Sequence, residues 1–227
     1  MIGILAGMGP KSTGPFVDQL VSTFQRLTGA KNDIDFPPMM IYSLPTPFYV
    51  DRPIDHSLIE KTICAGLQKL EDCGASFIAM PCNTAHLYFS QLQQCIGIPL
   101  LNIVTATLDR MPESIGKITI LGTRPTIESG IYQKWLEHAH LKLVLESSWQ
   151  KKIDDLILSI KSAASFKKSA QLWEELAKDL QKAGVDTVVL ACTDLNVVLQ
   201  STSPPLKIVD SSLCLAEEIV KKWEELR

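Results

Sequence analysis

Two cysteines occupy matching places in the two halves of the chain. Cys82 lies eight positions after Gly74, and Cys192 lies eight positions after Gly184. In both halves the order is the end of a helix-like segment, the glycine, an apolar run and then the cysteine. This repeated order predicts two similar structural units, each of which places one thiol at an equivalent point.

Paired thiols are suited to moving a proton across a carbon atom. An unperturbed thiol has a pKa of about 8.5, so near neutral pH it exchanges with the thiolate at little cost. Two such groups on opposite faces of a substrate's α carbon would remove a proton from one face and return one to the other, which is racemisation. We therefore interpret Cys82 and Cys192 as an acid–base pair, with one thiolate and one thiol at rest. Buried cysteines are more often packing material, and we keep that interpretation for the four without a counterpart: Cys64, Cys73, Cys95 and Cys214.

Short apolar runs alternate with amphipathic segments of helix length, and this alternation predicts the elements that position these thiols. This alternation favours an α/β fold with two pseudo-symmetric lobes, each a mainly parallel sheet flanked by helices. Residues 4–7 and 120–123 also match, which supports the duplication. We expect residues 1–100 with 210–227 to form the lobe of Cys82, and residues 101–209 to form the lobe of Cys192. Ligands bind beyond the carboxyl ends of parallel strands, so the active site is expected in the cleft between the lobes.

The expected elements are read from β-branched runs and from apolar residues recurring at three- and four-residue steps. Predicted strands are Ile2–Ala6, Met39–Ser43, Ser76–Met80, Leu100–Val104, Lys117–Leu121, Lys142–Leu145, Thr187–Ala191 and Lys207–Val209. Predicted helices are Gly14–Leu27, Ser57–Cys73, Lys151–Ala164 and Ala170–Ala183.

Composition points to a small-molecule partner. The formal net charge of −3 gives no electrostatic reason to expect nucleic acid or an anionic membrane. The apolar start of the chain is broken at Gly7 and Gly9, so it predicts a buried strand rather than a signal peptide or membrane span. We therefore expect a cytoplasmic protein whose six cysteines are mainly thiols, so that disulfides are a poor explanation for them. No C-x-x-C pair occurs, and no metal site is expected.

Several other residues near the two cysteines are candidates for roles in the site. The glycine-rich segment 7–13 is either a contact for a small anion or substrate, or a simple tight turn. His86, four residues after Cys82, either tunes that thiol or packs as a structural histidine. Asp194 is a candidate helix cap or a hydrogen-bonding partner of the site. Three polar neighbours are candidates to stabilise a thiolate: Asn83, Thr84 and Thr193.

The sequence resembles the aspartate/glutamate racemase family, within it the aspartate racemase branch. The motifs that carry the resemblance are Gly7-Met8-Gly9-Pro10, Pro81-Cys82-Asn83-Thr84-Ala85-His86, Leu121-Gly122-Thr123 and Ala191-Cys192-Thr193-Asp194. The resemblance implies catalysis by Cys82 and Cys192 without pyridoxal phosphate or any other cofactor, and commonly a homodimer. It also implies substrate contacts from Met8, Asn83, Thr84, Thr123, Lys161 and Thr193.

This chain departs from the family pattern at three places. Asp194 stands where glutamate is usual, and Cys214 lies near the position where a histidine often follows the late Asp-Ser pair. Aspartate-specific members place an arginine in the loop after the second strand, and here the corresponding segment, 43–52, ends at Arg52. Either Arg52 binds the substrate's side-chain carboxylate from a shifted position, or the pocket is less selective for acidic side chains.

The leading hypothesis is a racemase for aspartate, or for aspartate and glutamate. One alternative is a broad-specificity amino-acid racemase. A second is a two-cysteine isomerase related to hydantoin racemases or maleate isomerases, against which the P-C-N-T-A-H run argues. A third is an inactive relative that only binds an amino acid.

Overall fold

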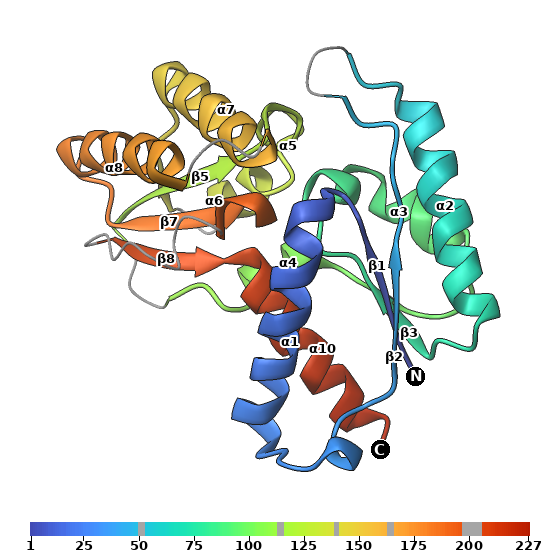
Figure 1. Cartoon of the computed structure of the whole chain (residues 1–227). Coiled ribbons are helices and arrows are strands. Elements are labelled where there is room, and N and C mark those ends of the chain that lie inside the picture. Colours follow the sequence, from blue (N-terminus) through green and yellow to red (C-terminus); the bar gives the residue numbers. More distant parts are fainter. Residues whose placement is uncertain (50–52, 113–115, 139–140, 163–165, 197–205) are drawn as a thin grey trace. The chain divides into compact units, whose positions relative to one another are not determined.

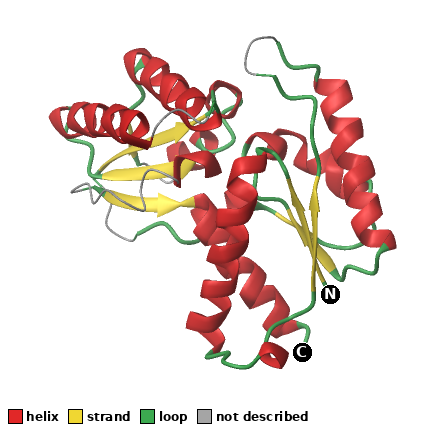
Figure 2. Ribbon diagram, viewed as in Figure 1, coloured by secondary structure: helices red, strands yellow, loops and turns green. Residues whose placement is uncertain are grey.

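The computed structural model describes residues 1–49, 53–112, 116–138, 141–162, 166–196 and 206–227. The chain forms two compact units, Met1–Ala106 with Ser212–Arg227, and Thr107–Ser211. Each unit contains one parallel four-stranded sheet with helices against it (Figures 1 and 2). Among the described residues, four short 3-10 helices join these elements: η1 (Pro10–Ser12), η2 (Asp33–Asp35), η3 (Thr84–Tyr88) and η4 (Thr193–Leu195).

The first unit is built on a sheet in the order β2-β1-β3-β4. Its strands are β1 (Ile2–Ala6), β2 (Met39–Ser43), β3 (Phe77–Ala79) and β4 (Leu100–Leu101). Its helices are α1 (Thr13–Thr28), α2 (His56–Asp72), α3 (Phe89–Gln94), the first part of α4 (Ile103–Leu108) and nearly all of α10 (Ser211–Glu225). Helices α1 and α10 lie on one face of the sheet and α2 lies on the other (Figure 1). One apolar face of α2 packs on β1 and β3, where it buries Ile63 and Leu67 against Leu5 and Ile78.

The second unit is built on a sheet in the order β6-β5-β7-β8. Its strands are β5 (Lys117–Gly122), β6 (Lys142–Leu143), β7 (Thr187–Ala191) and β8 (Lys207–Asp210). Its remaining helices within the described ranges are α5 (Arg124–Glu128), α6 (Gln133–His138), α7 (Ser147–Lys161) and α8 (Phe166–Lys182). Helices α7 and α8 lie side by side, and the buried Leu156 of α7 and Trp173 of α8 belong to one apolar core with Leu190 of β7.

The two sheets have the same strand order and the same register, which confirms the predicted pseudo-symmetric α/β architecture. Ile4 of β1 pairs with Ala79 of β3, and the equivalent Ile120 of β5 pairs with Val189 of β7. The outer pairs, β3 with β4 and β7 with β8, are also parallel. Because the strands correspond one to one, β3 and β7 are equivalent elements, and so are the segments that follow them.

Three predicted strands are shorter than expected: β3 is Phe77–Ala79 instead of Ser76–Met80, β6 is Lys142–Leu143 instead of Lys142–Leu145, and β4 is the third. The apolar run Leu100–Val104 was expected to be a strand throughout, but β4 ends at Leu101 and α4 begins at Ile103. Asn102 explains the change, because its side-chain oxygen accepts hydrogen bonds from the N–H groups of Val104 and Thr105 at 2.9 and 3.3 Å. This is a helix N-cap, which overrides the strand propensity of the β-branched residues.

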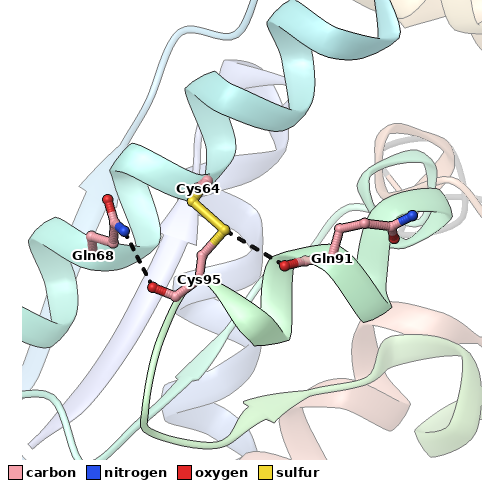
Figure 3. Close-up of a disulfide and its surroundings, with 4 residues drawn as sticks. All are labelled: Cys64, Gln68, Gln91 and Cys95. Carbon is pink, nitrogen blue, oxygen red and sulfur yellow. Dashed lines mark hydrogen bonds between the residues drawn. A yellow bond between two sulfur atoms is a disulfide. The ribbon is translucent and has the colours of Figure 1, made fainter.

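A disulfide corrects two expectations, that disulfides are a poor explanation for the cysteines and that Cys64 and Cys95 serve only as packing material. Cys64 of α2 is joined to Cys95, which follows α3 directly, with their Cα atoms 5.9 Å apart (Figure 3). Gln68 also reaches this link, since its side-chain amide donates to Cys95 O at 3.3 Å. No short spacing signals the pair, because the two cysteines are 31 residues apart and meet only when α2 and α3 pack together.

We expect this disulfide to be measurable in a thiol titration. Unreduced protein in denaturant should show four reactive thiols, and protein treated with dithiothreitol should show six. Closing a loop of this length lowers the entropy of the unfolded chain, so the oxidised form should be more stable by about 3–4 kcal/mol in urea unfolding. Six thiols before reduction would contradict the disulfide.

None of the helices in the described part of the chain is both long enough and apolar enough to cross a membrane.

Candidate active site

Cys82 lies on a short segment between the end of β3 and the start of η3. Its backbone N–H donates to Met80 O at 2.8 Å, which turns the chain sharply after the strand. The side chain of Cys82 is partly exposed, whereas that of the next residue, Asn83, is buried. The thiol is therefore carried at the carboxyl edge of the first sheet, where parallel α/β sheets bind ligands.

Cys192 has the equivalent position in the second unit. It follows the last residue of β7 directly, has an extended backbone, and accepts a hydrogen bond from Leu195 N–H at 3.1 Å as η4 begins. Cys192 is buried, and so is the next residue, Thr193. Each cysteine thus follows the carboxyl end of the equivalent strand of its own sheet and is itself followed by a 3-10 helix.

His86 connects the backbone around Cys82 to the end of the neighbouring strand. Its Nδ1 lies 2.8 Å from Cys82 O, and its Nε2 accepts from Ile103 N–H at 3.1 Å and lies 3.4 Å from Leu101 O. Since Nε2 accepts, we assign the proton to Nδ1, which donates to Cys82 O. Burial lowers the pKa of His86, opposed by its bonds to the Cys82 and Leu101 carbonyls. The ring is therefore neutral near pH 7 and contacts backbone, so of the two open interpretations the structural one is supported.

Thr123 lies beside the segment of Cys192 at the same sheet edge. Gly122, the last residue of β5, pairs with Ala191, and Thr123 and Cys192 are the next residues along each strand. An added Cβ at Gly122 would lie 3.1 Å from Ala191 O, so glycine permits this close approach. Thr123 also caps α5, with its side-chain oxygen 3.4 Å from Thr126 N.

Lys161 and Asp194 form an ion pair next to Cys192. Lys161 is the last residue of α7, and its Nζ lies 2.9 Å from Asp194 Oδ2. The Asp194 side chain is only 4% exposed, and its Oδ1 has no hydrogen-bond partner among the residues described. Asp194 is thus not the helix cap that we considered, since the N-cap of η4 is Cys192. The ion pair places a cation and a buried carboxylate immediately beyond the second cysteine.

The glycine-rich segment after β1 is a tight turn that bonds to itself. Gly7 has a φ of 94°, and an added Cβ would lie 2.6 Å from the backbone of Leu44. Gly7 N–H donates to the Thr13 hydroxyl at 3.1 Å, and the Ser12 hydroxyl donates to Gly9 O at 2.9 Å. The fold thus requires a glycine at position 7 and the side-chain hydrogen bonds of Ser12 and Thr13 in this turn.

Arg52, which was also predicted to be part of the site, lies outside the described residues.

Sequence reasoning missed one residue of this region. Asn196 donates through Nδ2 to Asp210 Oδ1 at 3.1 Å, and so links η4 to the end of β8. The internal repeat contained the signal, because Asn196 follows Cys192 by four residues, as His86 follows Cys82. Within the described residues, no group of three or more His, Cys, Asp or Glu side chains is arranged to hold a metal ion.

The fold and the two equivalent cysteine segments together define a duplicated α/β enzyme of the isomerase type predicted from the motifs. A model of the Asp/Glu/hydantoin racemase family matches residues 5–219. The chain belongs to this family, and its assignment as a racemase is confirmed.

Comparisons with individual proteins agree with this membership. The chain is 47% identical over 223 residues to the broad specificity amino-acid racemase RacX of Bacillus subtilis, covering 98% of both proteins. Its structure is similar to an aspartate racemase of Picrophilus torridus, with a TM-score of 0.84, 26% identity, and coverage of 97% and 93% of the two chains. A glutamate racemase of Bacillus anthracis shares the fold, with a TM-score of 0.69 at 18% identity over 100% of this chain and 82% of that one.

Proposed function

We propose that the protein racemises amino acids by two-base proton transfer between Cys82 and Cys192, with no cofactor. One observation carries the proposal: the two thiols follow equivalent strands in two sheets of identical order and register. An internal duplication that repeats a thiol at one position supplies the two similar groups that proton exchange between two faces of a carbon requires.

In this mechanism one cysteine acts as thiolate and the other as thiol. The thiolate removes the α proton of the bound enantiomer, and the thiol on the opposite face donates its proton to the carbanion-like carbon. The product leaves the two cysteines with their protonation states exchanged, ready for the opposite enantiomer. The Lys161 ammonium and the backbone N–H groups at the starts of η3 and η4 favour the negative charge of a thiolate or substrate carboxylate.

The substrate contacts that the resemblance implies belong to the same proposal. Asn83 and Thr193 support it by their position, because each directly follows a cysteine. Thr123 lies at the same sheet edge as Cys192, and Lys161 forms an ion pair with Asp194, two residues after Cys192. The remaining proposed contacts are Met8, Thr84 and Arg52.

For the substrate we propose a broad range of amino acids, with aspartate or aspartate and glutamate as the second candidate. The 47% identity with RacX over nearly the whole of both chains favours the broad range. The segment 43–52 also favours it, since its arginine, Arg52, is shifted in sequence from the position of the arginine in aspartate-specific members. The structural similarity to the Picrophilus torridus aspartate racemase supports the second candidate.

A panel of enantiopure amino acids tests both activity and substrate range. We expect several neutral and basic amino acids to lose optical purity at rates within about tenfold of aspartate, because an arginine shifted in sequence from the position of aspartate-specific members would give acidic side chains less advantage. Chiral chromatography of each reaction measures this. Scrambling of aspartate and glutamate alone would select the narrower candidate. Turnover of hydantoins or maleate without any amino acid would contradict the proposal.

We also propose the homodimer and the cytoplasmic location that the family resemblance and the sequence imply. Exposed apolar side chains support the dimer: Ile34 is 90% exposed, and Met40 and Ile41 of the edge strand β2 are about 40% exposed.

A further inference from the structure

Each cysteine segment is tied to the end of the neighbouring strand by a polar side chain. His86 follows Cys82 by four residues, and Asn196 follows Cys192 by four residues. In the first sheet β3 lies beside β4, and in the second β7 lies beside β8, so the neighbouring strands are equivalent as well. The two ties therefore occupy the same place in the duplicated fold.

The tie in the first unit is made by the imidazole of His86. One ring nitrogen donates to Cys82 O at 2.8 Å, and the other accepts from Ile103 N–H at 3.1 Å, just beyond β4. Leu101, at the end of β4, pairs with Ala79 of β3, the strand that leads to Cys82. The ring therefore connects the end of β4 to the backbone of Cys82. His86 is 4% exposed, and the centroid of its ring lies 5.8 Å from that of the Phe89 ring, with an angle of 10° between the ring planes.

The tie in the second unit is made by the amide of Asn196. Its Nδ2 donates to Asp210 Oδ1 at 3.1 Å. Asp210 is the last residue of β8 and pairs with Leu190, two residues before Cys192. The chemistry differs from that of His86, but the connection is the same: the 3-10 helix after the cysteine is fixed to the end of the adjacent strand.

We propose that His86 and Asn196 are equivalent positioning residues, each of which holds the backbone segment that carries the cysteine of its own unit. Reacting groups must be held to within about 0.5 Å of their productive positions. The segment from Ala79 to Thr84 is too short to provide this through regular secondary structure, so a side-chain tie to a rigid strand supplies the restraint. The consequence for turnover rests on the proposed function, but the placement of each thiol does not.

Site-resolved alkylation of the two thiols tests the placement directly. Rates of reaction of iodoacetamide with Cys82 and Cys192 would be measured by peptide mass spectrometry in the wild type, His86→Leu, His86→Asn and Asn196→Leu. We expect His86→Leu to change the rate at Cys82 by about fivefold, the effect of one hydrogen bond, with little change at Cys192. Asn196→Leu should do the reverse, and His86→Asn should restore part of the wild-type rate because its amide can donate to Cys82 O.

A matched control separates positioning from general loosening of η3. His56 of α2 bonds the Tyr88 hydroxyl of η3 at 2.7 Å, so His56→Leu removes an imidazole bond to the same helix without touching the Cys82 backbone. This variant should keep the wild-type alkylation rate at Cys82. Thermal unfolding shows which variants fold. If His86→Leu does not fold, the two single variants Asn196→Leu and His86→Asn still test the inference.

The turnover of the same variants completes the test. We expect kcat to fall in His86→Leu and Asn196→Leu with KM nearly unchanged, because the substrate contacts remain. Unchanged alkylation, or equal changes at both cysteines, would overturn the positioning role. If Cys82→Ser kept full racemisation, the proposed function would fail, whereas the alkylation rates would still decide this inference.

Discussion

Replacing either Cys82 or Cys192 by serine should reduce the rate of racemisation by about a thousandfold or more, in both directions of the reaction. A serine hydroxyl has a far higher pKa than a thiol, so it neither forms the base nor donates a proton readily near neutral pH. Both directions pass through the same transition state, which needs both groups. Polarimetry from each pure enantiomer measures the loss, and full racemisation in either single variant would contradict the two-thiol mechanism.

Cys73 provides the matched control for these substitutions. It is an exposed thiol at the end of α2 and has no counterpart in the second half of the chain. Cys73→Ser should therefore keep wild-type turnover, so that a loss in the other two variants cannot be assigned to thiol removal in general.

Isotope exchange in heavy water separates two bases from one. With two thiols, the proton removed from one face differs from the proton delivered to the other, so deuterium should enter the product enantiomer before it accumulates in recovered substrate. Chiral separation followed by mass spectrometry measures both pools at low conversion. Equal early labelling of both enantiomers would indicate a single mobile base.

Much of the architecture could be predicted because each strand is nearly continuous in apolar residues. The run Thr187–Ala191 is buried along its whole length, as strands of a parallel sheet covered on both faces should be. The duplication was visible for a second reason: each glycine ends a helix in the left-handed region before the strand begins, with φ of 86° at Gly74 and 73° at Gly184. Positions with such strict backbone requirements leave a clear mark in a sequence.

Contacts between distant side chains left no such mark. Lys161 follows the pattern of a solvated lysine at a helix end, and nothing local indicates that it reaches Asp194. The disulfide between Cys64 and Cys95 likewise depends on how α2 and α3 pack. The equivalence of His86 and Asn196 was available from the repeat, but histidine and asparagine do not look alike, and only their bonds reveal the shared role.

Removing the side chain of Lys161 should strongly destabilise the second unit. Lys161→Ala leaves the buried Asp194 carboxylate without its cation, which costs about 3 kcal/mol in urea unfolding. The surface pair of Lys152 and Asp179, which links α7 to α8, is the control, because its side chains are about one third exposed. Lys152→Ala should cost at most about 1 kcal/mol. Equal losses in the two variants would show that the Lys161 pair is no more than a surface interaction.

A double variant distinguishes the structural role of Lys161 from its proposed contact with substrate. Lys161→Met combined with Asp194→Asn removes both charges, so no uncompensated carboxylate remains and most of the lost stability should return. If the ammonium also binds the substrate carboxylate, KM should rise in Lys161→Ala and stay raised in the double variant, because neither keeps the cation. A KM that recovers together with stability would mean that Lys161 acts only through Asp194. Stability therefore reports on the uncompensated Asp194 carboxylate, whereas KM reports on the Lys161 ammonium. Measuring both shows whether the lysine has one role or two.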